Sequence, residues 1–162
     1  LFDDLVADYF GAPQSIDELV ELGQWMQAEG YKALFEEARR QKPRASMALN
    51  WCFNEPWPTA ANNSLVSWPC RPKPAYHAVA ASCRPSLASL KIPRFAWSSG
   101  EVLDATLWIL HDGARPLAGG RARCRLIVGA RETTILEWAF PEAAANTHLR
   151  GPTVHAILPR LE

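Results

Sequence analysis

Residues 45–58 read ASMALNWCFNEPWP, so that an almost uncharged apolar run leads into aromatic residues and prolines. A short continuous apolar run that follows a helix is typical of a strand buried on both faces of a parallel sheet. We therefore predict a buried parallel strand over residues 45–53, as the strand of one helix–strand unit of an α/β repeat. The same run would also suit Trp51 as an ordinary core residue.

The residues upstream of this run predict a long amphipathic helix. Ser15 and Glu18 have the spacing of a capping box, in which the serine accepts from an early backbone N–H and the glutamate reaches back. Arg39 and Arg40 suit the negative end of the helix dipole, and a proline follows three residues later. The apolar positions form largely an i, i+3, i+4 stripe: Ile16, Leu19, Val20, Leu22, Trp25, Met26, Leu34, Phe35 and Ala38. Residues 1–10 are expected to end a preceding helix.

Prolines dominate the chain after residue 55. Five prolines lie between Pro56 and Pro74, which no helix or inner strand tolerates. We therefore expect a long irregular connection that carries Trp57 and Trp68, followed by a short helical turn near residues 76–82.

From residue 87 onwards, the pattern changes to short strands separated by turn signals. The predicted strands run near residues 88–96, 102–111, 121–128, 133–140 and 153–158. Such spacing is typical of an antiparallel β-sandwich, although five strands are few for a closed one. Arginines at alternate positions from 121 to 125 suit a strand with one solvated face or, as the alternative, a nucleic-acid-binding stripe.

The composition limits the classes of function. Hydrophobic residues make up 48% of the chain and charged residues 21%, which is typical of a globular protein with a core. The 17 basic residues balance 17 acidic ones, which argues against binding to nucleic acid phosphates. No window approaches 18 consecutive apolar residues, so no membrane span is predicted.

The four cysteines form no C-x-x-C pair; we expect small buried thiols rather than a zinc site, and disulfides stay open.

Polar and aromatic side chains follow the end of the predicted strand. In barrel enzymes the catalytic face lies at the carboxyl ends of the strands. A tryptophan stacks on the apolar face of a sugar ring, and amide and carboxylate groups bind its hydroxyls. We therefore predict a sugar-binding site made of Trp51, Asn54, Glu55 and Trp57. The alternative for Glu55 is a surface carboxylate or one that anchors a loop.

Three blocks of sequence resemble glycoside hydrolase family 2, in its branch of β-mannosidases and exo-β-glucosaminidases. The blocks are Tyr9–Val20, Asn50–Pro58, and Ser67–Trp68 with Arg71–Tyr76. The resemblance covers residues 9–85 and continues more loosely at Leu107–Asp112.

The resemblance implies an α+β fragment, because the family builds a TIM barrel flanked by β-sandwich domains. Residues 1–85 would be the C-terminal end of the barrel, with its last helix and strand and a Pro-rich connection. Residues 86–162 would begin an antiparallel immunoglobulin-like β-sandwich that is incomplete, and residues 45–54 would be the eighth barrel strand. Since the chain starts in mid-pattern, we expect it to be a C-terminal portion of a longer polypeptide.

The resemblance also implies a chemistry. The family hydrolyses β-glycosides with retention, using two glutamates about 5 Å apart at the ends of strands four and seven. Both would precede Leu1, so we expect no catalytic residue in this chain. Glu55 is the one candidate, because Asn54-Glu55-Pro56 also resembles the motif of the acid/base glutamate in related barrels. The β-mannosidase-like pattern usually has Asp or another residue there, which favours substrate binding or holding of the loop.

Trp51 takes its role from the resemblance as well. In related barrels, the tryptophan at the end of strand eight forms the floor of the sugar subsite and precedes a cis peptide bond. We therefore expect the Trp51–Cys52 bond to be cis.

These expectations combine into one function. The parent protein would be a retaining exo-β-glycosidase that hydrolyses terminal β-mannosides, β-glucosaminides or β-galactosides without cofactor or metal. Its partners would be the carbohydrate and the remainder of the polypeptide, not nucleic acid or membrane, and a secreted or periplasmic location is favoured over a cytoplasmic one. Alone, the chain should be inactive and prone to association. The alternative is a non-catalytic carbohydrate-binding or spacer module.

Overall fold

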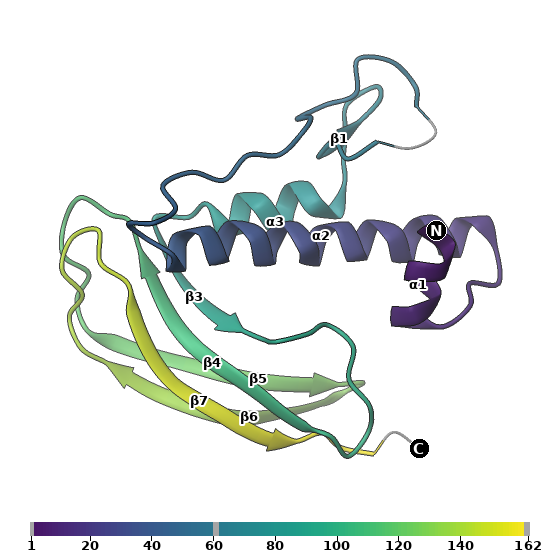
Figure 1. Ribbon diagram of the computed structural model, residues 1–162. Coiled ribbons are helices and arrows are strands. Elements are labelled where there is room, and N and C mark those ends of the chain that lie inside the picture. The colour runs from purple at the N-terminus through teal and green to yellow at the C-terminus, as the bar shows by residue number, and fades with distance from the viewer. Residues whose placement is uncertain (1, 60–61, 161–162) are drawn as a thin grey trace. The chain divides into compact units, whose positions relative to one another are not determined.

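The computed structural model describes residues 2–59 and 62–160, and the chain divides into two compact units, Leu1–Arg84 and Pro85–Glu162. The first unit contains α1 (Phe2–Phe10), α2 (Ile16–Arg40), β1 (Val66–Ser67), β2 (Arg71–Pro72) and α3 (Pro74–Ser82) (Figure 1). The second contains β3 (Ser86–Lys91), β4 (Val102–His111), β5 (Gly120–Val128), β6 (Arg131–Phe140) and β7 (Leu149–Ile157). Helices and a short antiparallel strand pair in the first unit, and antiparallel sheets in the second, make an α+β chain.

Helix α2 confirms the long helix predicted from the sequence. The Ser15 side chain accepts from the backbone N–H of Glu18 at 3.1 Å, as a helix N-cap does. The Glu18 carboxylate reaches back one residue further than in a regular capping box and accepts from the backbone N–H of Gln14 at 2.6 Å. Residues 2–10 form the preceding helix α1, also as expected.

Small residues make the contact between α2 and α3, which lie side by side (Figure 1). Ala28 of α2 and Ala75 of α3 are buried together with Leu65 and Val66. This contact does not bury the larger apolar side chains of the predicted stripe. Ile16, for example, is 71% exposed. The helix forms as predicted, but four large apolar residues of its stripe are about half exposed or more: Ile16, Val20, Trp25 and Leu34.

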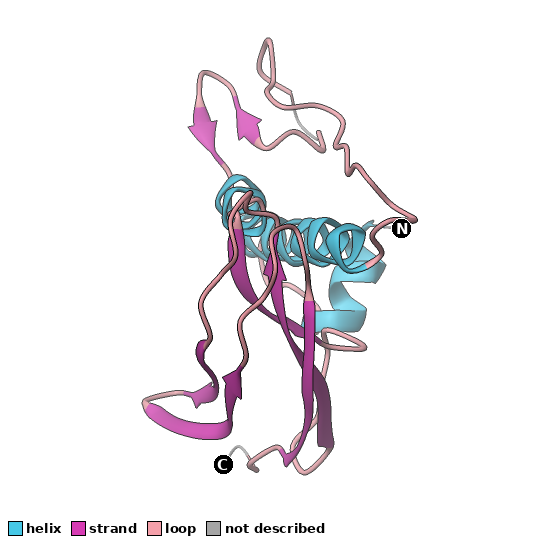
Figure 2. Cartoon of the chain, turned by 90° about the vertical axis from the view of Figure 1, so that its left-hand side faces the viewer, coloured by secondary structure: helices cyan, strands magenta, loops and turns pink. Residues whose placement is uncertain are grey.

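The predicted buried strand over residues 45–53 is wrong for the described structure. The segment has no regular secondary structure, and Figure 2 shows it within a long loop. Met47 and Leu49 are 69% and 75% exposed. A buried strand needs a hydrogen-bonded neighbour on each side. The described residues supply one isolated parallel bridge, between Asn54 and Val66 at the end of the segment.

The second unit consists of two antiparallel sheets in the orders β3-β4-β7 and β5-β6. Buried residues of β4, such as Leu107 and Ile109, pack against Trp138 and Phe140 of β6, so the two sheets face one another across a common core. This arrangement is consistent with the predicted β-sandwich. Strand β4 covers the residues expected of it.

Strand β7 begins four residues before the predicted strand, although Pro152 interrupts its sequence pattern. The pairing of β4 with β7 shifts register between Thr106 and Trp108, opposite this proline. An irregularity of this kind accommodates a residue that has no N–H to donate. Strand β3 is shorter than predicted and ends at Lys91, two residues before Pro93.

All four cysteines are unpaired, but only Cys124 is buried, whereas Cys70 and Cys83 are exposed. The expectation of buried thiols was therefore wrong for those two. Among the described residues, no helix is long and apolar enough to cross a membrane.

Candidate functional site

The four residues predicted to bind sugar lie in one seven-residue segment but in two different environments. Trp51 and Trp57 are 80% and 63% exposed, and Asn54 is also exposed. Glu55 is buried and 7% exposed. The segment therefore presents two indoles and an amide to solvent and turns one carboxylate inward.

The backbone at Trp51 has the geometry expected from the sequence. The Trp51–Cys52 peptide bond is cis, which confirms that expectation. The side-chain amide of Asn50 donates to the Cys52 carbonyl at 3.0 Å and so bridges this bond.

Backbone hydrogen bonds join the end of the segment to β1. The Phe53 carbonyl accepts from the N–H groups of Leu65 and Val66, both at 3.0 Å. The N–H of Glu55 donates to the Val66 carbonyl, also at 3.0 Å. The segment is thus held to the chain eleven to thirteen residues further on, while the run before Phe53 has no such pairing.

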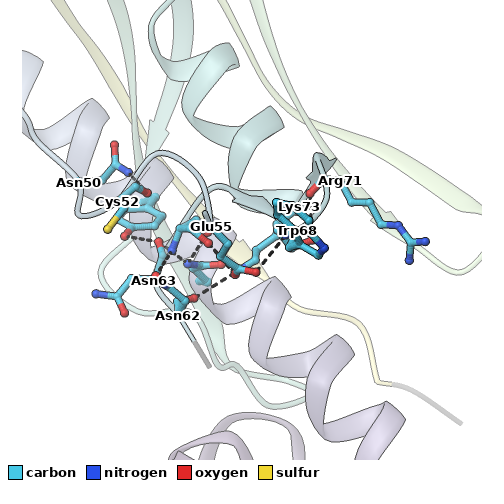
Figure 3. A network of polar contacts seen from close by, with 12 residues as sticks. Asn50, Cys52, Glu55, Asn62, Asn63, Trp68, Arg71 and Lys73 are labelled. Carbon is cyan, nitrogen blue, oxygen red and sulfur yellow. Dashed lines mark hydrogen bonds and ion pairs between the residues drawn. The ribbon is translucent and has the colours of Figure 1, made fainter. Parts of the chain in front are cut away.

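The Glu55 carboxylate is the centre of a polar network (Figure 3). One of its oxygens, Oε1, accepts from Lys73 Nζ at 2.9 Å and from the Ser64 hydroxyl at 2.8 Å. The other, Oε2, accepts from the backbone N–H of Trp68 at 3.1 Å. The hydrogen bond from Lys73 is the largest of the effects that lower the pKa of Glu55, to about 2, against the opposing effect of burial.

This environment suits an anchor rather than a general acid. A general acid has to carry a proton near the working pH, which usually requires a raised pKa. Glu55 is instead ionised, buried, and bonded to three donors of its own chain. The arrangement agrees with the alternative in which Glu55 holds the loop.

Lys73 is the partner that sequence reasoning missed. Its ammonium group donates to Glu55, to the Asn62 carbonyl at 3.0 Å and to the Ser64 hydroxyl at 3.0 Å, so three acceptors match its three protons. The signal was present in the sequence, because Glu55 is the only acidic residue between Glu37 and Glu101. A lone carboxylate among prolines and aromatic residues needs a cationic partner when it is buried.

The loop that holds Asn62, Asn63 and Ser64 is itself bonded to α2. Gln27 and Tyr31, one turn apart on the helix, both donate to the Asn63 carbonyl, at 2.9 and 3.0 Å. The network therefore runs from the helix through this loop to Glu55.

A groove of about 580 Å³ adjoins this network in the first unit. It is lined by Leu5, Val20, Gly23, Gln24, Met26, Gln27, Tyr31, Asn62, Asn63 and Lys73. None of the predicted sugar-binding residues lines the groove, so the structure does not bring the groove and that site together. Over residues 2–59 and 62–160, no three His, Cys, Asp or Glu side chains gather in a way that could hold a metal ion.

Comparison with known proteins gives a similarity of structure. No family model matches the chain, and no curated protein matches it. The beta-D-mannosidase from Dictyoglomus thermophilum matches 95% of the chain with a TM-score of 0.70 and 20% identity. The exo-chitosanase CsxA from Amycolatopsis orientalis matches 99% with a TM-score of 0.78 and 18% identity. A complex of that protein with PNP-beta-D-glucosamine gives 0.80 and 17%.

The chain spans 18% of the length of each of these structures. At such identities the likeness concerns the fold, and the chain shares its fold with a segment of each of these proteins.

Proposed function

We propose that this chain is the C-terminal portion of an exo-β-glycosidase that retains configuration and resembles glycoside hydrolase family 2. The observation that carries the proposal is Trp51, whose indole is 80% exposed, followed three residues later by the exposed Asn54 and then by the buried anchor Glu55. An exposed aromatic face on a fixed support, next to an amide, is suited to a sugar ring. The shared fold with segments of a beta-D-mannosidase and an exo-chitosanase supports it.

In this proposal the first unit is the end of a TIM barrel and the second the start of an immunoglobulin-like β-sandwich. Residues 45–54 would become the last barrel strand once neighbouring strands pair with them. The exposed side chains of Met47 and Leu49 favour this, because residues at alternate positions share one face of a strand and these two would give it an apolar face to bury. Alone, the chain exposes these residues and should associate.

We assign different roles to the four site residues. Trp51 is the floor of the sugar subsite, and Asn54 and Trp57 contact the substrate beside it. Glu55 acts through its contacts with Lys73 and Ser64 and not on the sugar. The two catalytic glutamates belong to the part of the polypeptide before Leu1, and the sugar-specific contacts belong to other barrel strands.

The test is to express the reading frame extended upstream of Leu1 and to assay aryl β-mannoside, β-glucosaminide and β-galactoside. Hydrolysis with retention is expected for one of them. Trp51→Ala should lower kcat/KM at least about tenfold, which corresponds to about 1.4 kcal/mol, and Trp51→Phe should lower it less because an aromatic face remains. Sugar binding without turnover would instead support a carbohydrate-binding module. The absence of both binding and turnover would contradict the proposal.

A further inference from the structure

Lys73 lies where two separate parts of the first unit meet. It donates to Glu55 on the segment that carries the exposed tryptophans, and to Asn62 and Ser64 on the loop that α2 holds (Figure 3). Its side chain is 11% exposed and that of Glu55 5%. An ammonium group has three donors, and here they are divided between the two parts.

We propose that Lys73 is a positioning residue of the sugar-binding segment, which it holds to the loop over residues 62–64 and thereby to α2. The proposal rests on the proposed function, in which Trp51 and Asn54 contact the sugar.

The position of Glu55 in the segment explains why this contact controls the site. Glu55 directly follows Asn54, is two residues before Trp57 and is four residues after Trp51. The chain before Phe53 makes no strand, so the segment is held by the backbone bonds to β1, by the edge-to-face contact of Phe53 with Tyr76, and by the side chain of Glu55. A displacement of about 1 Å in a binding group is enough to weaken a site strongly.

The link from the loop to the helix completes the support. Both Gln27 and Tyr31 donate to the Asn63 carbonyl, so the loop that receives two of the protons of Lys73 is held by a regular element. Sites supported by regular elements are more accurately placed than those on free loops. Lys73 is the residue that transmits this support to Glu55.

The test compares Lys73→Met with Lys32→Met, a matched control whose lysine forms an exposed pair with Glu29 at 3.7 Å. In the 162-residue chain labelled with 5-fluorotryptophan, the Trp51 resonance is assigned from Trp51→Phe. In Lys73→Met we expect that resonance to shift or broaden, and amide exchange at Val66 and Trp68 to rise at least about tenfold. Lys32→Met should match the wild type.

Two further variants keep the test valid if Lys73→Met unfolds the first unit. Lys73→Arg, which retains a donor cation, should restore part of the wild-type Trp51 signal. Ser64→Ala removes one donor to Glu55 but keeps the ion pair, so its effect on the same resonance should be smaller. A Trp51 signal that is unchanged in all three variants would overturn the role of Lys73, whatever the activity of the longer polypeptide.

In the longer polypeptide, Lys73→Met should raise KM for the aryl β-glycoside at least about tenfold and change kcat much less, as expected when binding of ground state and transition state is lost equally. An unchanged KM together with a changed Trp51 signal would reduce Lys73 to a structural residue and refute positioning. Absence of glycosidase activity in the wild type would remove the proposed function, and the sugar-positioning role with it, while the fluorine spectra would still report on the contact itself.

Discussion

Replacement of Glu55 by glutamine is the sharpest test of the polar network. The variant keeps the shape of the side chain but removes the charge that faces Lys73 at 2.9 Å. It also brings an NH2 group toward donors, because Glu55 accepts from Lys73, Ser64 and the N–H of Trp68. We therefore expect Glu55→Gln to destabilise the first unit more than a surface substitution does.

The environment of the pair sets the magnitude. Breaking a buried ion pair by removing one partner costs about 3–5 kcal/mol, and the lower end, about 3 kcal/mol, applies here because Lys73 retains 11% exposure and two other acceptors. An exposed pair would give about 1 kcal/mol or less.

The pH dependence of the stability provides a second, independent test of the network. The pKa of Glu55 is lowered from 4.5 to about 2 in the folded chain. A lowered pKa means that the ionised group stabilises the fold above pH 4.5, and that this stabilisation is lost as the pH falls through the folded value. The difference in free energy of unfolding between wild type and Glu55→Gln should therefore have its full size at pH 7 and should shrink as the pH falls from 4.5 to 2.

Urea unfolding followed by far-UV circular dichroism measures this difference, because all described helices lie in the first unit. Lys32→Met serves as the control for loss of an exposed pair. The reasoning is refuted by a difference below about 1 kcal/mol at neutral pH, or by one that stays constant as the pH falls to 2.

Three further predictions concern other parts of the chain. Ser15→Ala, which removes the N-cap of α2, should cost about 1 kcal/mol of unfolding free energy in the first unit, and a cost near zero in urea unfolding would contradict the cap. Cys124, buried and with its thiol pKa raised by burial, should react with Ellman's reagent far more slowly than the exposed Cys70, and equal rates in mass spectrometry of the labelled chain would contradict its burial. Gly151→Ala places a Cβ 2.6 Å from the Trp138 ring and should destabilise the second unit by about 1–3 kcal/mol, whereas an unchanged thermal transition would show that the ring moves aside freely.

The elements that the sequence predicted well are those with strong local signals. Helix α2 has a serine cap, a stripe of apolar residues and cations at its end, and it forms where those signals place it. Strand β4 alternates between less buried and buried positions from Val102 to Ile109, and its bounds agree with the prediction. At β7 the predicted start was four residues too late, because a sequence does not show that an irregularity in the partner strand accommodates Pro152.

The candidate site shows the limit of local reasoning. Trp51 and Asn54 were found because they lie at the end of an apolar run within a short block that resembles a known family, so the prediction needed only neighbouring residues. The contact between Glu55 and Lys73 joins residues 18 apart across a Pro-rich connection whose path no periodicity predicts. The predicted strand over residues 45–53 failed for a related reason, since an apolar run specifies burial but not the neighbours that provide it.

The same segment combines a completed anchor with an incomplete apolar face. Met47, Leu49, Trp51 and Phe53 occupy alternate positions and are all at least 60% exposed. Burial of one such side chain is worth about 1.5–3 kcal/mol, so this row leaves a substantial stabilisation unrealised among the described residues. Two residues after Phe53, by contrast, the Glu55 carboxylate already accepts hydrogen bonds from three donors of its own chain. In a barrel, the surrounding strands would cover Met47 and Leu49, and Trp51, nearer the carboxyl end of the run, would lie where a sugar would meet it. The proposed function thus requires both features of the segment. The contacts of Glu55 fix the position of the indole, and the exposed apolar row is the surface that the other barrel strands would bury.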